Sequence, residues 1–581
     1  MTEKWNSRAT NHSASRPNDP AESDLTPLSE RFEATPVIVK LLNERGITTP
    51  QEARKFFSPS LNDLHDPFLM PGMDVAVGRL NDAMGAKERI LVYGDYDVDG
   101  TTAVALVYKY LSQFYSQIDY YIPGRYDDGY GISKHVIDEA AASGVKLIII
   151  LDCGIKANDE IAYAKTLGID FIICDHHVAG EELPDAIAIL NPKLEGSTYP
   201  FSHLSGCGVG FKLMQAFARS NGLPQAPLDA MLDLVAVSIA ADIVPMIGEN
   251  RVMTYHGLRR LNTNPNMGLR AIMKICGLTR KEITISDVIF KIGPRINASG
   301  RMQSGREAVD LLVSRDAADA LRIAQEIDGY NSDRKELDKI ITDEANAILE
   351  ERGDLAAERK SIVIYNESWH RGIIGIVASR LTEDYYKPAV VLTLTNGLAS
   401  GSSRSVQGFD IYAAVESCAD LLENFGGHTY AVGLSMKPEN IKEFSRRFEE
   451  YVAANITPSQ MKPVCEIDAD IKFSEISTDL VEALNAFNPF GPGNTKPVFR
   501  TRGVRDCGSS KIVGKQMEHI KLDVVDPSVS EPLNAIAFNF AKDFERVSSG
   551  QPFTLIYTIE ENKHHAAGMP YQLLVKDIIF E

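Results

Sequence analysis

The chain has few cysteines, no long hydrophobic run and no excess of basic residues. Seven cysteines without a CxxC pair exclude a disulfide scaffold and a cysteine zinc site, and they predict a reducing cytoplasm. We find no signal peptide and no stretch of about 18 apolar residues, so no membrane span is expected. The 60 basic residues face 79 acidic ones, a net charge of −19. This excludes general polyanion coating, but not a nucleic-acid enzyme with local basic grooves or bound divalent metals.

The 581 residues suffice for three or four domains, and their patterns divide the chain into six segments. The first 33 residues are rich in Ser, Asn, Pro and charge, which predicts disorder. Short strands with period-two alternation near the C-terminus predict a small barrel. The predicted segments are a tail (1–33), a helical lead-in that packs on the main domain (34–88), a parallel α/β domain (89–315), a connecting helix (316–360), a smaller α/β domain (361–455) and a barrel (456–581).

One acidic stretch carries the strongest chemical signal. A strand-like run, 90–93, ends in Asp95, Asp97 and Asp99, and a buried helix follows. This layout places ligands at the carboxyl edge of an α/β sheet, and three carboxylates so close repel one another unless a cation neutralises them. An EF-hand would need Glu at the position of Leu106, so that alternative fails. A solvated acidic turn is the other alternative.

Further acids and histidines follow other predicted strands. The strand 146–151 ends in Asp152, and the strand 170–174 ends in Asp175-His176-His177. Because the carboxyl ends of parallel strands meet at one edge, these groups predict a shared metal site. The strand before the acidic stretch is predicted at 89–93, and the other strands of the predicted sheet are 118–122 and 186–190.

An apolar helix at 232–245 carries Asp242 near its end. A buried carboxylate is costly without a partner, and a metal would supply one. A helix-end carboxylate with its hydrogen bonds satisfied is the alternative. Cys153 and Cys174, which adjoin the predicted site, are interpreted as small buried filler.

Residues 94–100, 152–154, 175–177 and 241–245 resemble the four motifs of the DHH phosphoesterase superfamily. Residues 293–301 and 369–378 narrow the resemblance to the RecJ family of single-strand-specific exonucleases. The resemblance extends from about residue 35 to the C-terminus. It implies an α/β protein with a parallel-sheet DHH catalytic domain, a long connecting helix, a smaller α/β DHH-associated domain and a C-terminal OB-type barrel.

The resemblance also implies a centre of two divalent ions. The oxygen-rich donor set suits Mn²⁺ or Mg²⁺ better than zinc. Asp152 is the expected bridge, Asp95 is either a ligand or an orienting group, and Tyr93 stands where relatives can carry histidine. His177, Asp99 and Asp152 are the expected catalytic residues, with His177 facing the scissile phosphate. The implied ligands are Asp95, Asp97, Asp99, Asp152, His176 and Asp242.

The substrate-binding residues implied by the resemblance lie in both α/β domains. The arginine fork suits phosphate, although a structural ion pair is the alternative for each arginine. The glycine pair lets backbone approach a ligand, and the adjacent histidine can donate to phosphate. The candidates are Arg125, Arg295, Arg301, Ser403, Arg404, Gly426, Gly427 and His428.

The activity implied is metal-dependent 5′-to-3′ hydrolysis of single-stranded DNA to mononucleotides, in repair and recombination. Barrel aromatics would stack bases, and Phe538, Phe540 and Tyr557 are the candidates, with core packing expected for at least one. Arg502, Arg505, Lys511 and Lys515 predict either a basic patch or a solvated surface.

Two other functions stay open at this point. A DHH phosphodiesterase acting on short oligonucleotides or cyclic dinucleotides is one, although such relatives are usually smaller and lack the barrel. A non-catalytic DNA-binding scaffold is the other, although degenerate motifs would then be expected. The expected partners are single-stranded DNA, a helicase and a single-strand-binding protein, and the absence of sustained heptads favours a monomer.

Overall fold

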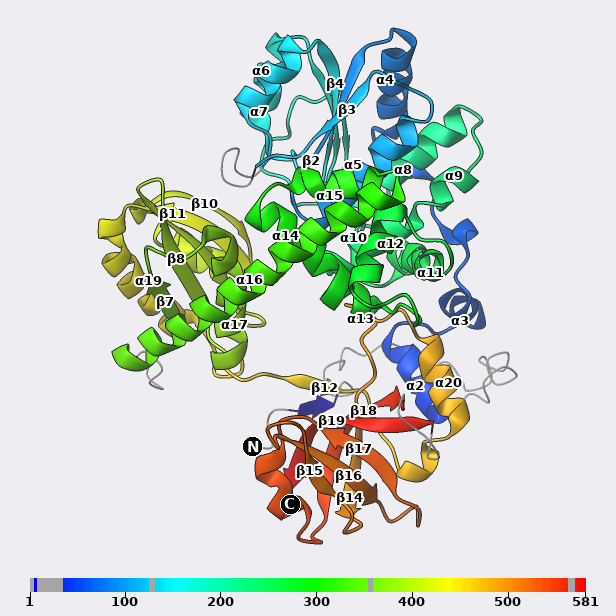
Figure 1. The fold of residues 1–581 in the computed structure, drawn as a ribbon, viewed down its shortest axis with the longest axis vertical. Helices are drawn as coiled ribbons and strands as arrows, with labels where there is room; N and C mark the ends of the chain where they lie inside the picture. The colour runs from blue at the N-terminus through cyan, green and yellow to red at the C-terminus, as the bar shows by residue number, and fades with distance from the viewer. Residues whose placement is uncertain (1–4, 8–34, 125–130, 354–358, 563–569, 581) are drawn as a thin grey trace.

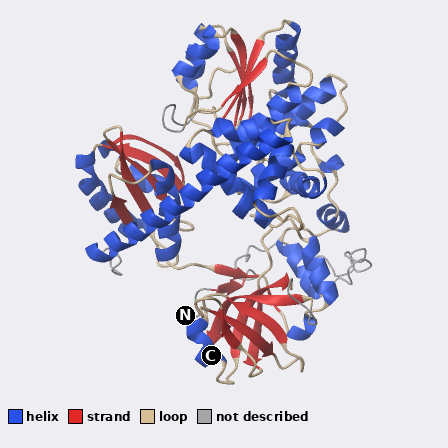
Figure 2. Cartoon of the chain, in the orientation of Figure 1, coloured by secondary structure: helices blue, strands red, loops and turns tan. Residues whose placement is uncertain are grey.

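The fold is seen in a computed structural model that describes residues 5–7, 35–124, 131–353, 359–562 and 570–580 (Figure 1). Two α/β units are joined by one long helix, and a barrel lies below them in this view. Figure 2 shows the strands gathered into a separate sheet in each unit. The predicted α/β class and the order of the units are confirmed.

The first unit contains a five-stranded parallel sheet in the order β3-β2-β4-β5-β6. Its chain order reverses between β2 and β4, the switch point at which doubly wound sheets bind ligands. The middle strands are almost continuously apolar, as expected for strands buried on both faces. The strands are β2 (Arg89–Gly94), β3 (Ile118–Tyr121), β4 (Val145–Leu151), β5 (Asp170–Cys174) and β6 (Ala188–Leu190).

Helices cover both faces of this sheet. The core on one face is shared with α4 (Met73–Gly85), α5 (Val98–Leu111) and α8 (Gly206–Ser220). The core on the other face is shared with α6 (Lys134–Ala142) and α7 (Asn158–Thr166). A further group of helices completes the unit: α9 (Ala226–Asp229), α10 (Leu232–Ala241), α11 (Gly248–Thr263), α12 (Met267–Ile275), α13 (Ile285–Asp287), α14 (Gly293–Met302) and α15 (Gly305–Val313).

The connecting helix is α16 (Ala317–Arg352), within the predicted segment. Asp316 caps its N-terminus through the amides of Ala318 and Asp319, and Gly353 ends it in the left-handed region. Ile323 and Ile327 pack into the core of the first unit, whereas Ile341 and Leu349 pack into that of the second. The helix therefore bridges two cores.

The second unit contains a five-stranded sheet in the order β10-β11-β9-β8-β7, of which only the β7–β8 pair is parallel. Its strands are β7 (Ile362–Tyr365), β8 (Ala389–Thr395), β9 (Leu398–Arg404), β10 (Leu422–His428) and β11 (Ala431–Met436). Its helices are α17 (Arg371–Tyr385), α18 (Ile411–Glu416) and α19 (Ile441–Asn455).

The C-terminal unit is a barrel, closed by pairing of Arg505 in β14 with Val525 in β16. Its strands are β13 (Ala469–Asp470), β14 (Phe499–Asp506), β15 (Lys511–Val513), β16 (His519–Val525), β17 (Leu533–Ala537), β18 (Phe553–Glu561) and β19 (Tyr571–Phe580). Its helices are α20 (Thr478–Ala486) and α21 (Phe544–Val547). No helix in the described part of the chain is both long and apolar enough to span a membrane.

The first part of the N-terminal lead-in differs from the prediction, whereas α4 in its second part packs into the core of the main domain. Helices α2 (Pro36–Glu44) and α3 (Pro50–Phe57) contribute to the barrel core and not to the core of the main domain. The apolar face of α2 needs a partner, and the barrel with α20 supplies it (Figure 1). Within the predicted tail, β1 (Trp5–Ser7) pairs with β12 (Cys465–Ile467), so the disorder prediction is wrong at these three residues. The rest of the predicted tail lies outside the described residues.

Candidate metal centre

The predicted ligands meet at the switch point of the parallel sheet. Three overlapping groups hold their ligand atoms within 4.8 Å of one another. Asp152 and His176 each belong to two groups, which fits shared ligands of a two-ion centre. The groups are Asp95 with Asp97 and Asp152, Asp99 with His176 and Asp242, and Asp152 with His176 and His177.

His176 lies at the middle of the acidic groups. Its Nε2 is 3.2 Å from an Asp152 oxygen, 3.6 Å from an Asp242 oxygen and 3.7 Å from an Asp99 oxygen. Burial is the main cause that lowers the pKa of His176 to about 4, so the ring is neutral at pH 7. The neutral imidazole is the form that binds a metal.

Asp99 is held by backbone groups that sequence reasoning missed. Its oxygens accept hydrogen bonds from the amides of Gly206 at 2.6 Å and Cys207 at 2.8 Å, at the start of α8, and from Ser238 Oγ at 2.7 Å. The positive end of the helix thus faces the carboxylate. A Cβ at Gly206 would lie 2.6 Å from the Asp152 Cβ, so the close approach requires glycine.

Two non-glycine residues at the centre have left-handed backbone. Asp152 has a φ of 60° and Ile243, directly after Asp242, has a φ of 58°. Such a conformation is costly, most of all for a β-branched residue, and it persists only where the surrounding structure holds it. These bends aim the Asp152 and Asp242 carboxylates from two different elements at one point.

The electrostatics of the acids fit bound cations. Burial, followed by the charge of Asp99, raises the pKa of Asp152 well above its usual range. The same causes raise the pKa of Asp97 and bring that of Asp242 to about 8. Among the described residues, no lysine or arginine forms an ion pair with these four acids, and His176 and His177 are the basic groups that lie with them. Divalent ions would relieve this repulsion, and carboxylates with one imidazole suit Mn²⁺ or Mg²⁺.

His177 is oriented by Asp175, whose role sequence reasoning did not predict. Their Nδ1 and Oδ1 atoms lie 2.8 Å apart, and Asp175 also accepts the amides of Ile155, His176 and His177. Burial would raise the pKa of Asp175, but the hydrogen bond from His177 outweighs it and the pKa falls to about 2. Burial likewise opposes the charge on His177, yet Asp175 raises the His177 pKa above its ordinary value.

Comparison with known proteins identifies the protein family. The DHH family N-terminal domain matches residues 89–239, the DHHA1 domain matches 358–454, and the RecJ OB domain matches 467–577. The single-stranded-DNA-specific exonuclease RecJ of Bacillus subtilis strain 168 is 36% identical over 561 residues, which cover 96% of this chain and 70% of that protein. The chain belongs to the RecJ family. The RecJ of Salmonella typhimurium strain LT2 is 33% identical, with 94% and 96% of the two chains covered.

A solved RecJ structure shares the fold. RecJ from Thermus thermophilus, in complex with Mn²⁺, superposes with a TM-score of 0.82 at 25% identity, over 97% of this chain and 78% of that one. In the present chain Tyr93 lies in β2, two residues before Asp95. Its ring stacks on Tyr121 and its hydroxyl donates to the Gly131 carbonyl at 2.6 Å, while Asp95 lies with Asp97 and Asp152.

The DHHA1 unit reaches the metal centre through His428. Its ring stacks on that of His177, with centroids 5.9 Å apart and planes 10° apart. Burial lowers the pKa of His428, and the charges of His177, Lys156 and Lys193 lower it further. These two lysines, which sequence reasoning missed because no motif contains them, bring positive charge toward the same face.

The other predicted substrate-binding residues differ from one another in the groups that they contact. Arg404 donates to Ser402 Oγ at 3.0 Å, and Ser403 exchanges hydrogen bonds with the Val432 backbone inside the sheet. Arg301 donates to the Gly372 carbonyl at 3.1 Å. Arg295 forms the structural ion pair that was its alternative, with Asp328 at 2.8 Å. Gly426 and Gly427 lie in β10, and Arg125 lies outside the described residues.

The three barrel aromatics differ in exposure. Tyr557 is fully buried and its hydroxyl lies 2.8 Å from Thr501 Oγ1, so it belongs to the core, as expected for at least one of them. Phe540 is partly buried against that core. Phe538 is 50% exposed and packs edge-on against His519. Of the three, Phe538 is the residue that can stack a base.

Proposed function

We propose that this chain is a metal-dependent exonuclease that hydrolyses single-stranded DNA from its 5′ end to mononucleotides, in DNA repair and recombination. The observation that carries the proposal is the convergence of five aspartates and His176 on one point of the sheet edge. The exonuclease names of the RecJ relatives support the substrate class. The direction of degradation rests on the family resemblance.

We infer that two Mn²⁺ or Mg²⁺ ions occupy the centre, as the Mn²⁺ complex of the Thermus relative supports. Bound ions of this kind supply an activated water and neutralise the phosphoryl charge. One ion would be held by the first group, Asp95, Asp97 and Asp152. The other ion would be held by Asp152 together with the second group of ligands. That second group consists of Asp99, His176 and Asp242.

His177 supplies the proton chemistry. Hydrolysis forms a bond from water oxygen to phosphorus and breaks the bond from phosphorus to the 3′ oxygen of the departing nucleotide. That oxygen needs a proton, and His177, whose pKa Asp175 raises, would donate one when protonated or bind the phosphate. His428, stacked on His177, would limit the passage to a single strand.

The alternatives fit less well. A phosphodiesterase for short or cyclic dinucleotides would not need the RecJ OB domain that matches 467–577. A non-catalytic scaffold would not need every acid and both histidines in place. The helicase and single-strand-binding partners, the monomeric state and the cytoplasmic location stay predictions.

The test uses the purified chain, Mn²⁺ or Mg²⁺, and a long single strand labelled at either end. We expect labelled mononucleotides early only from the 5′-labelled strand. Asp99→Ala should abolish hydrolysis while the melting temperature shows a folded protein, and Asp159→Ala, an exposed acid on α7, should cleave like the parent. Absence of nucleotide release with either metal would contradict the proposal.

A further inference from the structure

A second hollow lies away from the metal centre, at the other end of helix α5. Asp99 is in the first turn of α5 and Lys109 in its last, so about 15 Å of helix separates them. The hollow has a volume of about 320 Å³. It lies beside Ile118, the first residue of β3, and so at the opposite edge of the sheet from the metal centre. We call it the rear pocket, lined by Tyr108, Lys109, Ser112, Tyr115, Ser116, Ile118, Val313 and Arg315.

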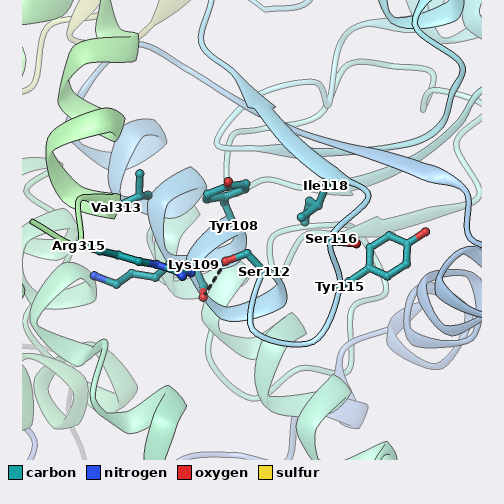
Figure 3. A pocket seen from close by; sticks show the side chains of 8 residues that line it. All are labelled: Tyr108, Lys109, Ser112, Tyr115, Ser116, Ile118, Val313 and Arg315. Carbon is teal, nitrogen blue, oxygen red and sulfur yellow. Dashed lines mark hydrogen bonds between the residues drawn. The ribbon is translucent and has the colours of Figure 1, made fainter.

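The charges of the rear pocket are of one sign. Lys109 and Arg315 both line it, and no lining residue is acidic, although the chain has a net charge of −19. Figure 3 shows the two basic side chains running side by side along one wall. Burial lowers the pKa of Lys109, and the charge of Arg315 lowers it further. The charge of the buried Asp233 acts in the opposite direction and offsets part of this shift. Two close cations without a lining carboxylate favour an anionic ligand.

Lys109 and Arg315 have hydrogen-bond donors available for such a ligand. Lys109 Nζ donates to the Leu312 carbonyl at 3.3 Å, which leaves two of its three donors. Asp233 accepts the amides of Leu234 and Asn266 and forms no ion pair with Lys109 among the described contacts. In the part of the chain that the structure describes, Arg315 forms no ion pair either. The cations therefore have donors to offer to phosphate oxygens.

The remaining walls suit a ring system. Tyr108 and Tyr115 flank the hollow, and Ile118 and Val313 add apolar surface (Figure 3). The volume lies at the lower end of the range for ligand pockets, enough for one nucleotide but not for an oligonucleotide. We propose that the rear pocket binds a nucleotide phosphate, with the phosphoryl group between Lys109 and Arg315 and the base or sugar against the tyrosines.

The competing explanation is structural. Lys109 donates to a carbonyl in the last turn of α15, and a cation at a helix C-terminus stabilises that end without any ligand. Arg315 would then be a solvated surface group. The two explanations differ in whether the protein binds a nucleotide when its metal centre is stripped.

The test is calorimetric titration of the full chain in EDTA with deoxyadenosine 5′-monophosphate, deoxyadenosine and inorganic phosphate. We expect one nucleotide per chain, competition by phosphate and no binding of the nucleoside. Lys109→Met, which keeps the aliphatic stem, and the exposed Arg315→Gln should each weaken binding by about tenfold or more. Arg322→Gln makes the same charge change on an exposed face of α16 and should bind like the parent.

Absence of nucleotide binding, or equal binding by the parent, Lys109→Met and Arg315→Gln, would overturn the proposal. Arg315→Gln keeps the test valid if Lys109→Met fails to fold. A single strand of twenty deoxyadenosine nucleotides distinguishes the two possible sources of the phosphate, a DNA strand and a free nucleotide. If it displaces the mononucleotide, the pocket takes a strand phosphate; if it does not, the pocket takes the free nucleotide.

Discussion

The catalytic unit meets its two neighbours through junctions of opposite character. At the metal face, the contacts with the DHHA1 unit include the His177–His428 ring pair and a hydrogen bond from Arg301 to the Gly372 carbonyl. On the barrel side, Arg251 is buried and donates at 2.9 to 3.1 Å to the carbonyls of Phe487, Asn488 and Pro489. Among the contacts of the described residues, the metal-face junction is sparse in hydrogen bonds, although Met302 and α16 also pack into the DHHA1 core, and the barrel junction is buried and densely bonded.

The barrel junction also supports the loop that follows Asp242, a proposed metal ligand. Arg251 lies over the Phe56 ring at 3.8 Å, and the Met246 amide donates to the Pro492 carbonyl at 2.6 Å. Met246 follows Asp242 by four residues. The comparison teaches that buried carbonyls bond the barrel to the catalytic unit, whereas the DHHA1 unit meets the metal face through one ring pair and a hydrogen bond from Arg301.

The largest effect is expected at the buried junction. Arg251→Met removes donors from buried carbonyls and should lower the free energy of unfolding by about 3 to 5 kcal/mol. Urea denaturation, with proteolysis to detect release of the barrel, measures it. Arg259→Met, an exposed change on the same helix, should cost less than about 0.5 kcal/mol. Similar losses for the two variants would erase the contrast between the junctions.

The next effect concerns the hairpin that carries His428. A Cβ at Gly427 would lie 2.2 Å from the Ala431 carbonyl oxygen, so Gly427→Ala should displace His428 and lower kcat/KM on single-stranded DNA by about tenfold or more. Gly433→Ala is the matched control, because its nearest neighbour, the Gly426 carbonyl oxygen, is 3.9 Å away. If both variants cleave alike, His428 does not contribute to the reaction.

A smaller effect tests the charge at the sparse junction. Since Asp175 raises the pKa of His177, the protonated ring stabilises the fold below pH 6.5, and that contribution is lost as pH rises through the raised pKa. Asp175→Asn should move the His177 titration midpoint to lower pH. Histidine ring NMR of the metal-free protein measures this, with Asp159→Asn as the control. An unchanged midpoint would show that Asp175 does not raise the pKa of His177.

The smallest effect is expected for Arg301. Arg301→Gln removes the hydrogen bond to Gly372 and should change the free energy of unfolding by about 1 kcal/mol or less. The same urea experiment measures it beside Arg251→Met. A loss as large as that of Arg251→Met would show that the metal-face junction is not sparse.

The sequence predicted local and periodic features well. The predicted bounds of β5 are those observed, because a continuous apolar run is a local signal. All six predicted ligands meet because each follows a recognisable strand or helix end. The anchoring of Asp99 by Gly206 could not be predicted, since it depends on which helix start faces the acid.

Long-range packing accounts for the remaining differences. The apolar face of α2 is visible in the sequence, but nothing local says that it packs with the barrel rather than with the main domain. The role of Arg251 is similar, because its carbonyl partners in the C-terminal unit lie more than two hundred residues away along the chain. Such contacts are properties of the assembled fold and not of any one segment.

The claim on which the account depends is that Asp152 is shared between two divalent ions. Titration with Mn²⁺, followed by electron paramagnetic resonance of the free ion, counts the sites directly. We predict two ions per chain for the parent and at most one, bound more weakly, for Asp152→Ala. Equal numbers of equally tight sites in both proteins would contradict the account.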